Sequence, residues 1–108
     1  MTMTATINEM AAAWADGATI VDVREPDEYA GGHVPGALLM PVSHVPARVA
    51  ELDQARPVYV ICRSGQRSLG ISEYLRSRGF DARSVEGGTV AWSDSGRPVV
   101  TGERASVA

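Results

Sequence analysis

The sequence predicts a single α/β domain in which a largely parallel sheet carries helices on both faces. Its 108 residues are the size of one domain. Short runs rich in β-branched residues alternate along the chain with segments of helical pattern. Such alternation favours parallel pairing, because each helix that connects two strands covers a face of the sheet. We expect the folded core at about residues 4–100 and a flexible tail at residues 101–108.

The first half of the chain is predicted to hold three strands and two helices. The strands cover residues 4–6, 19–23 and 37–40, and the helices cover residues 9–15 and 27–30. Asn8 is a suitable N-cap for the first helix, which Asp16-Gly17 ends. Pro26 suits the first position of the second helix, and the pair Gly31-Gly32 ends it.

The second half is predicted to hold two strands and three helices. The strands cover residues 57–61 and 82–85, and the helices cover residues 45–52, 67–78 and a short segment through 90–92. Ser43 is expected to cap the first of these helices, where Pro46 is tolerated only near the first turn. We expect the second of them to turn Leu69, Tyr74 and Leu75 toward the sheet.

Composition excludes several classes of protein. The net charge is −3 and all ten basic residues are Arg, so no strong basic field favours nucleic acid. No apolar run approaches the ~20 residues that span a bilayer. The N-terminus has no cationic segment followed by an apolar one, so we expect a cytoplasmic protein. One cysteine rules out an intramolecular disulfide and a multi-cysteine metal site, and with only two histidines we expect no metal.

The segment Cys62–Ser68 (Cys-Arg-Ser-Gly-Gln-Arg-Ser) runs from the end of a predicted strand into a predicted helix. In parallel sheets, active sites form at this edge. The amides of a tight loop and of a helix N-terminus lack partners and favour an anion, so a sulfur among them is stabilised as the thiolate. The alternative is an inert core cysteine, but such a residue does not need a glycine and two arginines beside it.

The two arginines of this segment add charge that persists at any accessible pH. We expect both Arg63 and Arg67 to attract an anionic substrate. The alternatives are that Arg63 is only solvated and that Arg67 pairs with an acidic neighbour on its own helix. Ser68 is expected either to donate its hydroxyl to the cavity or to cap the helix.

Three motifs together resemble those of the rhodaneses, which are thiosulfate sulfurtransferases. The segment Cys62–Ser68 is similar to the active-site loop of that family. Residues 22–37 resemble its upstream signature, as Asp-Val-Arg-Glu-Pro-Asp-Glu-Tyr followed by Gly-His-Val-Pro-Gly-Ala. Residues 86–92 (Glu-Gly-Gly-Thr-Val-Ala-Trp) are similar to its closing signature. The motifs keep the family's order and spacing, and the resemblance covers about residues 4–100.

The resemblance implies a three-layer α/β domain with a five-stranded, mostly parallel sheet. It also implies that Cys62 becomes a persulfide, taking a sulfane sulfur from thiosulfate or a related donor and passing it to cyanide or a thiol. No metal or organic cofactor is needed for this reaction. The substrate-binding residues that it implies are Arg63, Ser64, Gly65, Gln66, Arg67 and Ser68. Asp22 and Arg24, at the end of another strand, are implied to support the loop by ion pairing.

Loop length separates this chain from related classes. The cell-cycle-control phosphatases share the implied fold, but their arginine follows the cysteine by six residues, whereas Arg67 follows Cys62 by five. The shorter cradle suits a sulfur atom better than a phosphate. Mercaptopyruvate sulfurtransferases carry fewer charges after the cysteine, so thiosulfate or a persulfide donor is favoured. The open alternatives are a persulfide carrier for one protein partner and a catalytically inactive recognition domain. We expect a monomer or a weak dimer.

Other polar and aromatic residues are expected to be structural. His33 lies in a turn, and an ionised thiolate needs no general base. His44 has no motif around it. Trp14 and Trp92 are expected to pack in the core, and Gly87-Gly88 to allow a tight turn before a helix.

Overall fold

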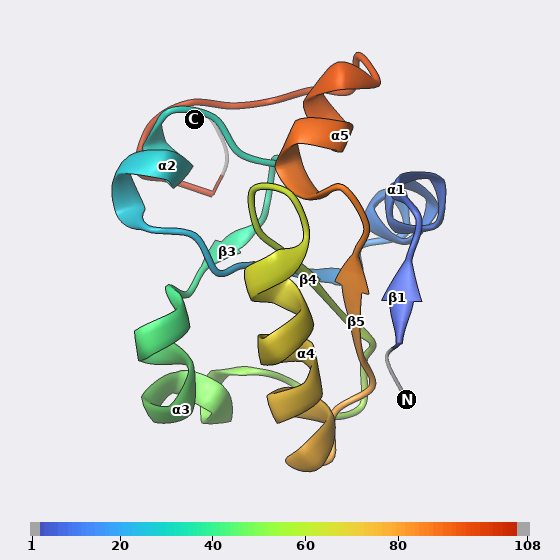
Figure 1. The fold of residues 1–108 in the computed structure, drawn as a ribbon, viewed down its shortest axis with the longest axis vertical. Coiled ribbons are helices and arrows are strands. Elements are labelled where there is room, and N and C mark those ends of the chain that lie inside the picture. The colour runs from blue at the N-terminus through green and yellow to red at the C-terminus, as the bar shows by residue number, and fades with distance from the viewer. Residues whose placement is uncertain (1–2, 106–108) are drawn as a thin grey trace.

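The computed structural model describes residues 3–105 and contains, over that range, one five-stranded sheet. The strands are β1 (Thr4–Ala5), β2 (Thr19–Asp22), β3 (Leu38–Leu39), β4 (Val58–Ile61) and β5 (Ala82–Val85). Their order is β1-β5-β4-β2-β3, and every pairing between neighbours is parallel (Figure 1). The predicted α/β class is therefore confirmed, and the described sheet is parallel throughout.

Helices cover both faces of the sheet. They are α1 (Ile7–Ala15), α2 (Pro26–Ala30), α3 (Val45–Arg48), α4 (Gln66–Ser77) and α5 (Gly88–Asp94), with 3₁₀ turns at Val42–His44 and Val49–Glu51. One face packs against α3 and α4, whereas α1, α2 and α5 pack on the other (Figure 1). This three-layer arrangement is the one that the sequence predicts.

The pleat of β4 shows how the two cores are filled. Side chains of a strand alternate between the faces of the sheet. Val58 and Val60 join the core under α4, where they meet Leu75. Tyr59 and Ile61 join the core on the opposite face. Because β4 is buried on both faces, its sequence is a continuous apolar run rather than an alternating one.

The first helix begins earlier than the sequence analysis expects, because its N-cap is Thr6 and not Asn8. The Thr6 Oγ1 accepts a hydrogen bond from the Glu9 amide at 3.1 Å, and the Glu9 carboxylate accepts one from the Thr6 amide at 2.8 Å. This capping box satisfies two amides that the helix leaves unpaired. Asn8 instead accepts a hydrogen bond from Arg97 at 2.9 Å.

The predicted helix over residues 45–52 is also wrong in its extent. Only the four residues of α3 are α-helical, and 3₁₀ turns flank them on both sides. Ser43 makes no capping hydrogen bond, because it lies inside the first of these turns. Pro46 does fall within the first turn of α3, the place where its missing N–H costs no hydrogen bond.

The inner face of α4 is more polar than predicted. The helix begins at Gln66 and its buried residues are Ser68, Ile71, Ser72 and Leu75. Leu75 is thus confirmed as a core residue, and the half-buried Tyr74 packs against the same core, whereas Leu69 is half-buried outside it. Two serine hydroxyls therefore lie between this helix and the sheet.

The described part of the C-terminal segment lies against the end of α2 and the chain that follows it. Gly102 donates an amide hydrogen bond to Ala30 at 2.8 Å, and the Gly36 amide donates one to Ala105 at 2.7 Å. Residues 106–108 are outside the described range, and the flexibility of the tail stays a prediction. No helix between residues 3 and 105 is long and apolar enough to cross a membrane.

Candidate active site

Cys62 directly follows β4 and lies at the carboxyl edge of the sheet. By the alternation of the strand it shares a face with Val58 and Val60, and it belongs to the same core under α4. The residue is only 1% exposed. Its sulfur therefore lies beneath the loop that connects β4 to α4, rather than on the surface.

The loop bends around this sulfur at Gly65, the N-cap of α4. Gly65 has a φ of +109°, a left-handed conformation that favours glycine. The bend aims the Gly65 amide at the Cys62 Sγ, at 3.1 Å. Burial raises the pKa of the Cys62 thiol, but the Ser68 hydroxyl and the amides of Ser68, Gly65 and Ser64 lower that pKa by more. The net lowering favours the thiolate, the nucleophilic form of cysteine.

The Ser68 side chain lies in the core beside the Cys62 sulfur and is not exposed at the surface of the loop. It is fully buried, and its Oγ is 3.5 Å from the Cys62 Sγ. It makes no capping hydrogen bond to α4, in contrast to one of the two expectations from the sequence. On its other side, Ser68 Oγ is 2.7 Å from the Oγ of Ser84 in β5. Ser68 therefore contacts the Cys62 sulfur itself.

The N-terminus of α5 holds the other side of the loop. The Thr89 amide and hydroxyl both donate to the Cys62 carbonyl, at 2.8 and 3.0 Å, and the Val90 amide donates to the Arg63 carbonyl at 3.1 Å. This contact requires Gly88, whose φ is +58°. A Cβ at that position would lie 2.5 Å from the Cys62 carbonyl oxygen and 2.6 Å from that of Arg63.

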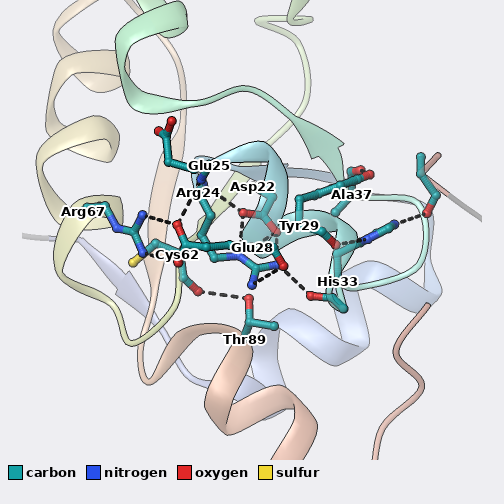
Figure 2. A network of polar contacts seen from close by, with 12 residues as sticks. Asp22, Arg24, Glu25, Glu28, Tyr29, His33, Ala37, Cys62, Arg67 and Thr89 are labelled. Atoms are coloured by element: carbon teal, nitrogen blue, oxygen red, sulfur yellow. Dashed lines mark hydrogen bonds and ion pairs between the residues drawn. The ribbon is translucent and has the colours of Figure 1, made fainter. Parts of the chain in front are cut away.

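Arg67 is held by Glu28 of α2 in a bidentate ion pair. The two Nη–Oε distances are 2.7 and 2.9 Å (Figure 2). The Arg67 guanidinium lowers the pKa of Glu28 from 4.5 to about 2. The sequence analysis considers an acidic partner for Arg67 only on its own helix, whereas the partner comes from another element. Both terminal nitrogens of Arg67 are thus occupied without any substrate.

Arg63 is the exposed cation of the loop. It makes no ion pair with any residue in the range 3–105 and borders a cavity of about 460 Å³. The cavity lies between α2 and α5, and its lining also includes Asp27, Thr89, Val90 and Asp94. Ser64 and Gln66, the residues on either side of Gly65 in the loop, are also exposed. Arg63 is therefore better placed than Arg67 to meet an incoming anion.

Asp22 and Arg24 form a buried ion pair at the end of β2. The Arg24 Nη2 is 2.8 Å from the Asp22 carboxylate, and the two side chains are 6% and 0% exposed (Figure 2). Arg24 also donates to the carbonyl of Glu28, at 3.3 Å, and to that of Gly32, at 2.8 Å. The pair thus fixes the C-terminal half of α2 and the residue Gly32 that follows it, and α2 is the helix that carries the partner of Arg67.

His33 and the tryptophans make structural contacts. The His33 ring stacks on Tyr29 with centroids 3.6 Å apart, and its nitrogens lie 2.8 Å from the Tyr29 carbonyl oxygen and 2.7 Å from that of Arg104. Trp92 is fully buried, which confirms its predicted place in the core. Trp14 is half-buried and meets Trp92 edge to face at 5.2 Å.

Three residues of the site are missed by the sequence analysis: Glu28, Ser84 and Thr89. Glu28 and Thr89 lie within the two flanking motifs, so the motifs locate them without indicating their contacts. Ser84 has a local signal, since it is a polar residue in a strand predicted to be buried. Its contact with Ser68 depends on the register between β5 and α4, which no local pattern specifies.

The fold and the loop define an α/β protein whose single cysteine lies at the carboxyl edge of a parallel sheet, where hydrogen bonds lower the pKa of its thiol. A model of the rhodanese-like domain matches residues 6–95. The chain therefore belongs to the rhodanese-like domain family, as the resemblance of its motifs implies.

Individual relatives support the assignment of the chain to this family. A sulfurtransferase of Allochromatium vinosum is 39% identical over 85 residues, which are 78% of this chain and 79% of that protein. YtwF of Bacillus subtilis (strain 168) is 38% identical over 79 residues, which are 73% of this chain and 77% of YtwF. The crystal structure of a rhodanese-related protein from Thermoplasma volcanium has a TM-score of 0.85 at 30% identity, covering 91% of this chain and 97% of that one.

Proposed function

We propose that this protein is a sulfurtransferase that carries a sulfane sulfur on Cys62 between an anionic donor and a thiol or cyanide acceptor. The observation that carries the proposal is the hydrogen bonding at the Cys62 Sγ, which receives the Gly65 amide at 3.1 Å and lies 3.5 Å from the Ser68 hydroxyl. These groups favour a nucleophilic thiolate without a general base. The name of the Allochromatium vinosum relative supports the same class of reaction.

In the first half-reaction the Cys62 thiolate attacks the outer sulfur of the donor. With thiosulfate, a bond forms between Sγ and the outer sulfur while the bond between the two donor sulfurs breaks. Its electron pair leaves with sulfite, and Cys62 becomes a persulfide anion. The amides of Ser64, Gly65 and Gln66 are the groups that we assign to this anion, because a loop at a helix N-terminus presents N–H groups to negative charge.

In the second half-reaction an acceptor thiolate or cyanide attacks the outer sulfur of the persulfide. The bond between that sulfur and Sγ breaks, and its electron pair returns to Cys62 as the thiolate. The products are an acceptor persulfide or thiocyanate. Neither half-reaction changes the number of protons on a side chain, so no general base is needed. Both are substitutions at sulfur that require no external oxidant or reductant, and we expect no metal or organic cofactor. Thiol acceptors stay reduced in the cytoplasm, where we expect the protein to act.

The exposed guanidinium of Arg63, rather than the net charge of a cavity lining that also holds Asp27, Glu28 and Asp94, favours a small anion as the sulfur donor. We assign the first contact with the donor to Arg63, whose guanidinium is exposed and borders the cavity. Arg67 can take part only if the donor replaces Glu28, to which it is bound at 2.7 Å. We assign Asp22 and Arg24 a supporting role, since they fix α2 and thereby Glu28.

The pairing of Arg67 with Glu28 also favours a second candidate function. If that cation is neutralised within the protein, small dianionic donors are attracted less strongly, and Cys62 then serves as a persulfide carrier that receives sulfur from a protein partner. Steady-state turnover distinguishes the two functions. Thiosulfate and cyanide are expected to give sulfite and thiocyanate in equal amounts with the wild type and none with Cys62→Ser. Loading of Cys62 by an organic persulfide without thiosulfate turnover identifies a carrier, and turnover retained in Cys62→Ser rejects both functions.

A further inference from the structure

Ser84 is a buried hydroxyl with no part in the reaction described above. It lies in β5, is 1% exposed and faces α4 from the same side of the sheet as Ala82. Its Oγ is 2.7 Å from the Ser68 Oγ, which is 3.5 Å from the Cys62 Sγ. The three groups form a hydroxyl chain, Cys62–Ser68–Ser84, that runs from the reactive sulfur into the core.

The protons of this hydroxyl chain can point in two directions. When Cys62 is a thiol, its S–H donates to Ser68 and Ser68 donates to Ser84, whose own proton has no further acceptor among residues 3–105. When Cys62 is a thiolate, Ser84 donates to Ser68 and Ser68 donates to the sulfur, so each proton has an acceptor. A neutral thiol in this second arrangement would have to accept the hydrogen bond from Ser68, and a thiol sulfur is only a weak acceptor.

A buried hydroxyl without an acceptor is costly, and hydrogen bonds in a chain strengthen one another. The thiolate completes the hydroxyl chain and the thiol leaves it incomplete. We propose that Ser84 is a positioning residue that orients the Ser68 hydroxyl toward Cys62 and thereby stabilises the Cys62 thiolate. The inference deepens the proposed function and rests on it for its bearing on catalysis. No proton moves along the chain; the hydroxyls reorient, and the thiol proton is released to water.

Ser84 then acts on both half-reactions through the sulfur. It increases the fraction of Cys62 that is ionised and able to attack the donor. It also favours the return of Sγ to a thiolate when the acceptor removes the outer sulfur, because a thiol of lower pKa leaves faster. Loss of the Ser84 hydroxyl is therefore expected to slow the second half-reaction even at a pH where all the cysteine is ionised.

The test is the rate at which iodoacetamide alkylates Cys62 as a function of pH. In Ser84→Ala the rate profile is expected to move to higher pH, so that the rate on its acidic limb falls about 3- to 10-fold. Ser72→Ala is the matched control, because Ser72 is a buried serine of α4 that lies outside the hydroxyl chain. Its hydroxyl donates to the Leu69 carbonyl at 2.9 Å. Its profile is expected to coincide with that of the wild type.

A double-mutant cycle separates this role from a general loosening of the core. Ser84 acts through Ser68, so Ser84→Ala is expected to change nothing further in a Ser68→Ala background. Ser84→Thr and Ser84→Val form a second pair of nearly equal size that differ in the hydroxyl, and only the valine variant is expected to shift the profile. An unshifted Ser84→Ala profile, an equal shift in Ser72→Ala, or an undiminished shift in the Ser68→Ala background overturns the inference.

Alkylation needs neither a sulfur donor nor an acceptor. A shifted profile in a protein that transfers no sulfur therefore supports the role of Ser84 in stabilising the thiolate while the proposed function fails. Sulfur transfer together with an unshifted profile supports the proposed function and rejects the role of Ser84.

Discussion

Replacing Glu28 with glutamine is expected to strengthen the binding of thiosulfate. In the wild type, both terminal nitrogens of Arg67 are bound by the Glu28 carboxylate at 2.7 and 2.9 Å. A dianionic donor that uses Arg67 must first replace this carboxylate. Glutamine keeps the size and one acceptor oxygen of the side chain but removes the charge, so Arg67 is released to the donor.

The magnitude follows from the exposure of the pair. Two charges about 4 Å apart attract each other by about 4 kcal/mol at the effective dielectric constant of a protein surface. The Arg67 and Glu28 side chains are 38% and 27% exposed, so solvent screening and the cost of ordering both side chains offset most of that attraction. A net pairing free energy of about 1 kcal/mol remains. Its release corresponds to a KM for thiosulfate that is lower by about fivefold.

The assay is sulfite release at fixed ionic strength over a range of thiosulfate concentrations. Glu51→Gln is the control, because Glu51 forms an exposed ion pair with Arg48 at 2.9 Å and does not line the cavity. Its KM is expected to equal that of the wild type. Arg67→Ala is expected to remove the gain when it is combined with Glu28→Gln. An unchanged or higher KM in Glu28→Gln would show that Arg67 does not bind the donor.

Two further predictions concern stability and the shape of the loop. Arg67 lowers the pKa of Glu28 from 4.5 to about 2, so the pair stabilises the fold fully above pH 4.5, and about 1 kcal/mol of that stability is lost as the pH falls toward 2. Urea unfolding at several pH values is expected to show this loss in the wild type but not in Glu28→Gln, and equal acid sensitivity of the two proteins would reject it. Gly88→Ala places a Cβ 2.5 Å from the Cys62 carbonyl oxygen, which is expected to cost about 2 kcal/mol of stability and to lower sulfur transfer. Gly70→Ala, whose Cβ meets nothing within 4 Å, is the control, and equal stability of the two alanine variants would contradict the steric argument.

Local patterns in the sequence predict most of the strands and the position of the cysteine. The apolar run of β4 and the glycine of the Cys62–Ser68 segment are such patterns, since each reflects the burial or the backbone conformation of its own residues. The capping box of Thr6 and Glu9 is equally local, and its Thr-x-x-Glu spacing indicates the start of α1. Asn8 suits an N-cap by residue type alone, but the residue three positions after it is Ala11, which cannot complete a capping box.

The contacts that complete the site depend on topology rather than on local pattern. Glu28 and Arg67 are 39 residues apart, and they meet because β2 and β4 are neighbours in the sheet. Ser68 and Ser84 are 16 residues apart and meet because β5 presents Ser84 to the face that α4 covers. A sequence without its strand order does not specify either contact. The extent of α3 is not specified by local pattern either, because most residues of the 3₁₀ turns on either side of it are exposed and follow no helical period.

The intact mass of the protein after incubation with thiosulfate tests the central claim most directly. A persulfide on Cys62 is expected to add one sulfur atom, ~32 Da, and cyanide is expected to remove it. The Cys62→Ser variant is expected to gain no mass under the same conditions. A reduced wild-type protein that gains no sulfur from thiosulfate, mercaptopyruvate or an organic persulfide, or a Cys62→Ser variant that gains the same mass, would contradict covalent sulfur transfer through this cysteine.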